Sequence, residues 1–157
     1  LGEIQSKGLE FDMQGQITPE LNIILNYANT DVEITKDSDP ANVGTKVAGF
    51  AKHITNGWLN YNFKKESLFK GFGISAGYQY QVDRSSWNWG SDGSTSELPD
   101  YFRLDGAVSW KNDHFNVTLN VNNILNKYLY SGSNYGTYLY WQSEPGINGR
   151  VTVAYRF

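Results

Sequence analysis

The sequence predicts an all-β fold, an antiparallel transmembrane β-barrel segment of about seven meandering strands, on three observations. Apolar and polar residues alternate with period two through most of the chain, which is the signal of a half-buried strand. The connections between the alternating stretches are short and long in turn. Aromatic residues make up 15% of the 157 residues although the mean hydropathy is only −0.51. A wall that is apolar and aromatic outside and polar inside explains this mixture better than a soluble core does.

Composition excludes several classes of protein and site. The net charge is −3 with no basic stretch, which argues against a nucleic-acid partner. Cysteine is absent, so we expect no disulfide and no thiolate metal site. No apolar run reaches the length of about 18 residues that a membrane helix needs. The N-terminus lacks the pattern of a signal peptide, so we expect a cytoplasmic protein, a mature protein or a fragment of one.

The first half of the chain contains four alternating stretches, at residues 8–16, 21–34, 53–63 and 71–82. A short turn around Pro19 joins the first pair, because proline suits the φ angle of a turn. The third and fourth stretches are also joined by a short segment, whereas a long loop over about residues 36–52 separates the pairs. Ile24 breaks the alternation of the second stretch.

The second half contains three more alternating stretches, at residues 101–110, 115–122 and 151–157. The first two are joined by a tight turn at residues 111–114. Long loops are predicted over about residues 84–99 and 126–148. In the last stretch Val151, Val153, Tyr155 and Phe157 share one face, which suits either a lipid-facing barrel strand or the last strand of a soluble sandwich.

The alternation of short and long connections is typical of outer-membrane barrels, whose periplasmic turns are short and whose external loops are long. With the short turns on one side, five aromatic residues fall near one membrane level and predict an aromatic girdle: Phe63, Phe72, Trp110, Phe115 and Phe157. Taken singly, each of these residues is also compatible with ordinary packing, and their common level favours the girdle for the set.

The strand count limits the possible barrels. Closed single-chain bacterial barrels have an even number of strands, and an unpaired strand edge is not tolerated in lipid. We therefore expect either an eighth strand within residues 128–142, which would give a free-standing small barrel for adhesion or structure, or a place in a larger barrel. A soluble β-sandwich that binds carbohydrate through its tryptophans is the third alternative.

Four segments carry a family resemblance when read in order. Residues 2–10 are similar to G-E-x-x-S-x-G-x-E, and residues 98–105 are similar to L-P-x-Y-x-x-x-D. Residues 120–127 are similar to N-V-x-N-L-F-D-K, and residues 150–157 to a last strand that ends on Phe. On these motifs the chain resembles the C-terminal part of the TonB-dependent outer-membrane receptors, most closely the ferric-siderophore type.

This resemblance implies a barrel of about 22 strands around a plug, in the outer membrane of a Gram-negative bacterium. It implies active uptake of ferric siderophores, with TonB as the energy-supplying partner and outer-membrane lipid as the surroundings, without enzymatic activity and without a resident cofactor. We expect residues 1–157 to be the C-terminal part of that barrel, with the plug and earlier strands outside this chain. The sequence departs from the family where Asn126 replaces Asp, where Pro145 and Arg150 are separated, and where a loop cysteine pair is missing.

Aromatic residues of the long loops are the candidate ligand-binding residues: Trp87, Trp89, Tyr135, Tyr138, Tyr140 and Trp141. Aromatic faces supply apolar area at low entropy cost, and tyrosine hydroxyls hydrogen-bond siderophore oxygens. The equally weighted alternative is that these residues pack the loops on one another or belong to the outer girdle.

The sequence supports metal binding, nucleotide binding and acid–base catalysis only weakly. His53 and His114 fall in different predicted places, so no metal site is expected. The Asp37-Ser38-Asp39 run has poor spacing for a calcium loop, and the G-x-G-x-x-A letters at residues 71–76 lie in a strand. Charged residues alternate away from the lipid face and are interpreted as wall residues rather than catalytic acids and bases: Glu10, Asp12, Arg103, Asp105 and Arg156.

Overall fold

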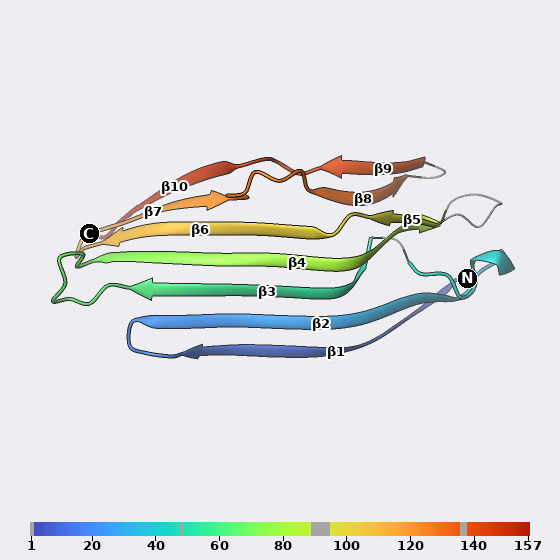
Figure 1. Ribbon diagram of the computed structural model, residues 1–157, viewed down its shortest axis with the longest axis horizontal. Helices are drawn as coiled ribbons and strands as arrows, with labels where there is room; N and C mark the ends of the chain where they lie inside the picture. The colour runs from blue at the N-terminus through green and yellow to red at the C-terminus, as the bar shows by residue number, and fades with distance from the viewer. Residues whose placement is uncertain (1, 48, 89–94, 136–137) are drawn as a thin grey trace.

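A computed structural model describes residues 2–47, 49–88, 95–135 and 138–157. Figure 1 shows long strands side by side in a single curved layer, in the antiparallel order β1-β2-β3-β4-β6-β7-β10. The bounds of these strands are β1 Glu3–Gln16, β2 Leu21–Lys36, β3 Ala51–Asn62, β4 Phe72–Asn88, β6 Tyr101–Lys111, β7 Phe115–Asn122 and β10 Asn148–Tyr155. The seven-stranded meander predicted from alternation is confirmed, and the sheet is open, with β1 and β10 at its two edges.

The long connections contain further structure. A 3-10 turn, η1 (Pro40–Asn42), lies between β2 and β3, and β5 (Thr95–Leu98) pairs with the extended end of β4. Within the predicted loop at 126–148, β8 (Tyr130–Tyr135) and β9 (Tyr138–Ser143) form a hairpin. These two strands pair with each other in a separate sheet, so the segment at 128–142 does not add an eighth strand to the wall.

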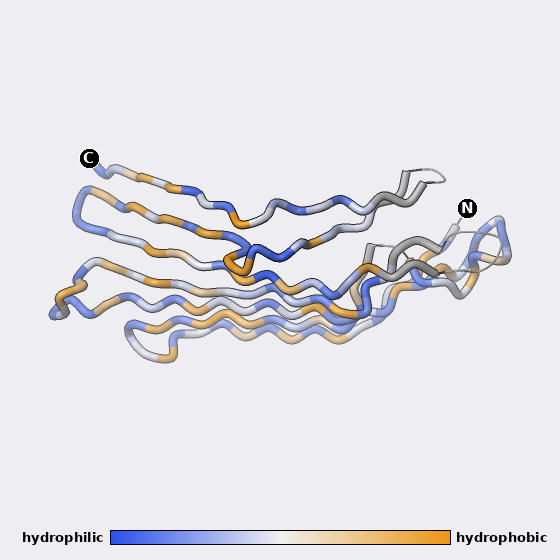
Figure 2. Tube along the Cα trace, turned by 45° about the horizontal axis from the view of Figure 1, so that its top comes forward, coloured by the Kyte–Doolittle hydropathy of each residue, from blue (hydrophilic) through white to orange (hydrophobic). Residues whose placement is uncertain are grey.

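The register places apolar and polar residues on opposite faces of the wall. One row across neighbouring strands is Met13, Leu25, Gly57, Tyr78 and Leu104. The adjacent row, one residue away along each strand and therefore on the opposite face, is Asp12, Asn26, Asn56, Gln79 and Arg103. Figure 2 shows the same alternation of hydropathy along the strands. We call the first face the apolar face and the second the polar face.

The apolar face is uncovered. Leu9 is 78% exposed and Val151 is 64% exposed, although both lie inside regular strands. A soluble sandwich would bury such residues under a second sheet, whereas the described part of this chain forms one layer with a small hairpin at its end. Among the described residues, no helix is long and apolar enough to cross a membrane.

Ile24 and Trp58 are apolar residues on the polar face, and they lie opposite each other on β2 and β3. Trp58 is in turn opposite Gly77 of β4, and a Cβ added to Gly77 would overlap the Trp58 ring. The glycine therefore makes room for the indole. The break in alternation at Ile24 places this side chain beside the tryptophan rather than marking the end of a strand.

The two ends of the sheet differ. The short turns at residues 17–20, 63–71 and 112–114 lie together with the C-terminus at what we call the short-turn end. The β2–β3 loop, β5 and the β8–β9 hairpin lie at the opposite, long-loop end. Side chains close the short turns, because the Asn112 Oδ1 atom accepts hydrogen bonds from the backbone N–H groups of His114 (2.9 Å) and Phe115 (2.7 Å).

The predicted aromatic girdle lies at the short-turn end. Phe72 is opposite Trp110, and Phe115 is opposite Tyr155. The closing strand begins and ends earlier than the predicted 151–157, because β10 starts at Asn148 and stops at Tyr155, so that Phe157 follows the strand.

Candidate functional site

A small core forms at the long-loop end, where the β8–β9 hairpin meets the wall. Leu98, Tyr101 and Leu129 are each at most 5% exposed, in contrast to the open sheet below them. Gly132 of β8 comes so close to β5 that a Cβ there would lie 2.8 Å from the Leu98 Cδ1 atom. Close packing of this kind fixes the position of the hairpin against β5.

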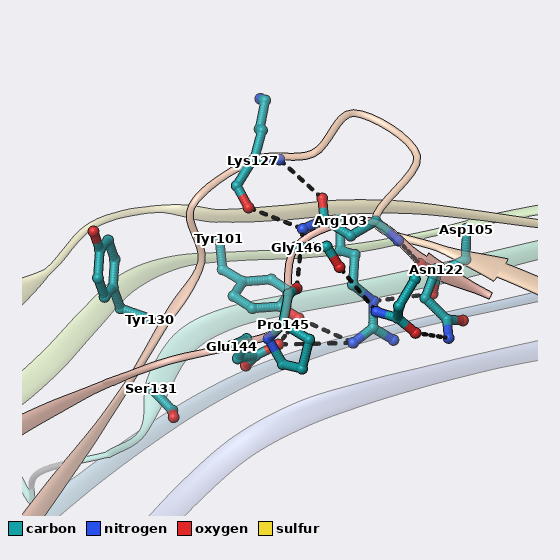
Figure 3. Close-up of polar contacts among 12 residues, drawn as sticks. Tyr101, Arg103, Asp105, Asn122, Lys127, Tyr130, Ser131, Glu144, Pro145 and Gly146 are labelled. Atoms are coloured by element: carbon teal, nitrogen blue, oxygen red, sulfur yellow. Dashed lines mark hydrogen bonds and ion pairs between the residues drawn. The ribbon is translucent and has the colours of Figure 1, made fainter.

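Polar side chains continue this core toward the polar face (Figure 3). The Arg103 Nε atom donates to the Asp105 carboxylate at 3.0 Å, and its Nη1 atom donates to the Tyr101 hydroxyl oxygen at 3.2 Å. The Tyr101 hydroxyl donates to the Glu144 Oε2 atom at 2.9 Å. We call Tyr101, Arg103, Asp105 and Glu144 the anchor cluster, because it ties the segment after β9 to strand β6.

Asn123 joins both ends of the long β7–β10 connection and is 1% exposed. Its backbone N–H donates to the Asp105 Oδ1 atom at 2.8 Å. Its side chain donates to the carbonyl oxygens of Lys127 (2.9 Å) and Pro145 (3.3 Å), and its Oδ1 atom accepts from the Lys127 backbone N–H at 3.0 Å. Its φ of 51° is a left-handed conformation that asparagine adopts more readily than most residues do.

Asn126, which replaces the Asp of the family motif, has a comparable role. Its Oδ1 atom accepts from the Ile147 backbone N–H at 2.9 Å, and its φ is 48°. An aspartate carboxylate would accept the same hydrogen bond, so this departure preserves the contact.

Arg84 holds the start of the hairpin. It is 8% exposed, and its guanidinium donates to the carbonyl oxygens of Pro99 (3.0 Å) and Tyr130 (2.8 Å). The same group lies 5.3 Å from the centre of the Tyr101 ring, within cation–π range. Hydrogen bonds from a charged group that is largely withdrawn from water are among the stronger ones in proteins.

Of the six predicted ligand-binding aromatic residues, the structure describes the side chain of Trp141 alone. Trp141 of β9 is 44% exposed and stacks at a tilt against Tyr130, with ring centres 5.8 Å apart. The backbones of Trp87, Tyr135, Tyr138 and Tyr140 lie in β4, β8 and β9. The side chains of those four residues, and Trp89 as a whole, lie outside the described part of the chain. The part of β4 that carries Trp87 and the two strands of the hairpin lie at the long-loop end. The role of these residues in binding stays a prediction.

The predicted wall charges take two kinds of position. Glu10, Asp12, Arg103 and Asp105 lie on the polar face, and the last two also belong to the anchor cluster. Arg156 follows the end of β10. Sequence reasoning did not single out Arg84, Asn123 or Glu144 as site residues. Asn123 was inside a family motif, whereas the partners of Arg84 and Glu144 are 15 to 46 residues away in the sequence.

The residues considered for a metal site or a calcium loop have structural positions instead. Among the described residues, no group of three or more His, Cys, Asp or Glu side chains is placed to hold a metal ion. The Asp39 carboxylate accepts from the Ala41 backbone N–H and caps η1. The backbone N–H of Asp39 stabilises the Asp37 carboxylate and lowers its pKa, as does a hydrogen bond from Asn42. These acids therefore order the loop.

The polar face retains hydrogen-bonding capacity. The Oδ1 atoms of Asn26 and Asn56 are buried without a partner in the described part of the chain. Both residues line a hollow of about 170 Å³ together with Glu10 and Asp12. Buried carbonyl oxygens are costly to leave unpaired, so this face suits contact with water or with N–H and O–H donors.

Comparisons with known proteins agree with this geometry. The profile of the family described as TonB dependent receptor-like, beta-barrel matches residues 1–124. The chain is 27% identical to the ferrioxamine B receptor of Salmonella typhimurium over 99% of its own length and 22% of that protein. It is 26% identical to the ferrichrome outer membrane transporter/phage receptor of Escherichia coli over 99% of its length and 20% of that protein.

Solved structures show the same fold. The ferric yersiniabactin uptake receptor of Yersinia pestis superposes with a TM-score of 0.77 at 17% identity, over 99% of this chain and 24% of that one. The chain spans about a fifth of the length of these two curated relatives.

Proposed function

This chain belongs to the TonB-dependent receptor β-barrel family. From this premise we propose that it forms part of the wall and of the external rim of an outer-membrane transporter for ferric siderophores, which is energised through TonB. The single observation that carries the proposal is the two-faced wall, apolar on one side and polar on the other, in a chain that matches this family. Lipid accounts for the uncovered apolar face, and a hydrated lumen accounts for the polar face.

We propose that residues 1–157 are the C-terminal part of a larger barrel. The sheet has two edges, at β1 and β10, and an open sheet edge in lipid would leave backbone N–H and C=O groups without partners. Further strands on both sides satisfy these groups. The long-loop end then faces outward, where it meets ligand, and the short-turn end faces the periplasm.

The proposed cargo is a ferric siderophore, and the iron is substrate rather than a resident cofactor. Support comes from the relatives named as ferrioxamine B receptor and ferrichrome transporter. The β8–β9 hairpin carries the ring of Trp141 at the rim, held from below by the anchor cluster and Arg84. The proposed function requires no bond to be made or broken. The residues of the rim bind and position the ligand, and the protein acts as a receptor rather than an enzyme.

The direct test is growth and transport. A strain that lacks this receptor is supplied with ferrioxamine B, ferrichrome or a ferric catecholate as its sole iron source, and uptake of radioactive iron is measured. We expect the protein expressed from its natural reading frame to restore uptake of at least one of these chelates, and a strain without TonB to show none. Failure to restore uptake of any ferric siderophore would contradict the proposed substrate class.

The rim aromatics provide a sharper test of the binding site. Trp141→Ala removes an exposed ring and should weaken binding of the transported chelate by about two- to tenfold, the range for a single aromatic contact. Phe115→Ala is the matched control, because it truncates an exposed ring at the short-turn end. Equal affinities for all three proteins, measured by fluorescence titration, would exclude Trp141 from the site.

A further inference from the structure

The short-turn end contains a hollow that the uptake function does not use. It has a volume of about 580 Å³ and lies between the β3–β4 turn and the β6–β7 turn. Its aromatic lining includes Phe63, Phe72 and Trp110, and the last two are cross-strand neighbours on the apolar face. One side of the hollow is therefore continuous with the surface that we assign to lipid.

The hollow is basic in a chain whose net charge is −3. Lys65, Lys70 and Lys111 line it, against Asp113 as the one carboxylate among its lining residues. Within the described part of the chain, these three lysines form no ion pair, whereas the neighbouring Lys64 lies 3.8 Å from Glu20. Unpaired ammonium groups around a concave surface favour an anionic group between them.

The backbone holds the two turns together at this point. Gly71 has a φ of 84°, and its carbonyl oxygen accepts from the Lys111 backbone N–H at 2.8 Å. A Cβ at Gly71 would collide with the Lys111 carbonyl oxygen, so the close approach requires glycine. Beside this junction, Leu68 is 100% exposed and Phe69 is 58% exposed, so the β3–β4 turn presents apolar side chains between lysines.

We propose that this hollow is a binding site for an anionic glycerophospholipid of the membrane leaflet at the short-turn end. The phosphate lies among Lys65 and Lys70 of the β3–β4 turn and Lys111, the last residue of β6. Lys111 follows Trp110 and so starts on the polar face, and its long side chain reaches the hollow around the end of the strand. The acyl chains run along the apolar face past Phe72 and Trp110. Aromatic rings and lysines at the boundary between hydrocarbon and water are the groups that anchor a protein to lipid headgroups. The proposal rests on the membrane location in the proposed function but not on siderophore transport.

Quenching of Trp110 by brominated lipid tests the site. The protein, produced from its natural reading frame, is inserted into phosphatidylcholine vesicles in which one tenth of the lipid is brominated phosphatidylglycerol or, separately, brominated phosphatidylcholine. The Trp110 signal is the difference between wild type and Trp110→Phe. We expect the brominated phosphatidylglycerol to be enriched at Trp110 over the phosphatidylcholine by fivefold or more, because one lysine near an anionic surface contributes a preference of about fivefold.

Lysine variants separate a site from general charge attraction. The triple variant K65Q/K70Q/K111Q should abolish the enrichment, and K65R/K70R/K111R should retain it. The matched control K7Q/K36Q/K46Q removes the same charge at or toward the long-loop end and should leave the enrichment unchanged. Equal quenching by the two lipids in wild type, or an equal loss in both glutamine triples, would overturn the proposal.

The outcomes also separate this proposal from the proposed function. A protein that inserts and shows the enrichment but transports no siderophore refutes only the function. A protein that transports siderophore without the enrichment refutes only the lipid site. A protein that does not insert into any vesicle overturns both.

Discussion

Single residues decide how the two faces of the wall are built. Gly77 has no side chain at the place where the Trp58 ring lies, and Asn123 satisfies groups at both ends of a long connection. In both cases the residue type follows from a neighbour on another part of the chain. A larger residue at Gly77 or an apolar one at Asn123 would keep the strand pattern but remove the contact.

Gly77→Ala should destabilise the protein by about 1–3 kcal/mol, because the added methyl group overlaps the Trp58 ring. Gly15→Ala is the matched control, since nothing lies within 4 Å of a Cβ there. Urea unfolding in phospholipid vesicles measures both. The double variant Trp58→Leu with Gly77→Ala should recover part of the loss, and equal midpoints for the two alanine variants would show that the indole does not occupy this space.

Asn123→Ala should cost about 1–3 kcal/mol locally, because it leaves the Lys127 N–H and two carbonyl oxygens without the partner that the buried Asn123 side chain provides. We expect faster protease cleavage within residues 123–147 and weaker ligand binding. Asn116→Ala, on the exposed part of β7, is the control and should be cleaved at the wild-type rate. Unchanged cleavage in Asn123→Ala would show that the connection is held by other contacts.

At the scale of elements, successive residues of each strand lie on opposite faces of the wall, one apolar and one polar. Met13 lies in the apolar row and Gln14 on the polar face, next to each other on β1. The long connections also contain elements of their own. Among the described residues, β8 and β9 pair only with each other, and Glu144, which follows β9, joins them to Tyr101 of β6. The hairpin is therefore a separate two-stranded sheet that packs on the end of a continuous wall.

Met13→Arg places a charge among lipid chains and should cost about 2–4 kcal/mol if this row lies at the membrane midplane. Gln14→Arg directs the same group to the lumen and should be nearly neutral. Unfolding of both variants in vesicles, with yield of membrane-inserted protein as a second readout, tests the assignment of faces. A greater loss for Gln14→Arg would reverse that assignment.

At the scale of the whole molecule, the two ends of the sheet are chemically distinct. Short turns, aromatic rings and three lysines without an ion pair among the described residues lie at one end. The hairpin, β5 and the polar anchor cluster lie at the other. This polarity fits a barrel that crosses a membrane once in each strand.

The chain has no cysteine, so introduced thiols report this orientation directly. A membrane-impermeant maleimide should label Ala41→Cys, in the exposed β2–β3 loop, on intact cells. It should label Glu66→Cys, in the β3–β4 turn, only after the cells are lysed. The parent protein gives the background, and labelling of Glu66→Cys alone on intact cells would show the opposite orientation.

The sequence by itself determined the strands of the wall and their two faces. Period-two alternation is a local property, and it located each of the seven strands, the short turns at one end and the positions of Glu10, Asp12, Arg103 and Asp105 on the polar face. The tertiary structure alone decided the rim and the basic hollow. Tyr101 and Glu144 are 43 residues apart, Arg84 and Tyr130 are 46 apart, and Lys65 and Lys111 come from different turns. Such contacts depend on the register of several strands at once, and no local pattern encodes them.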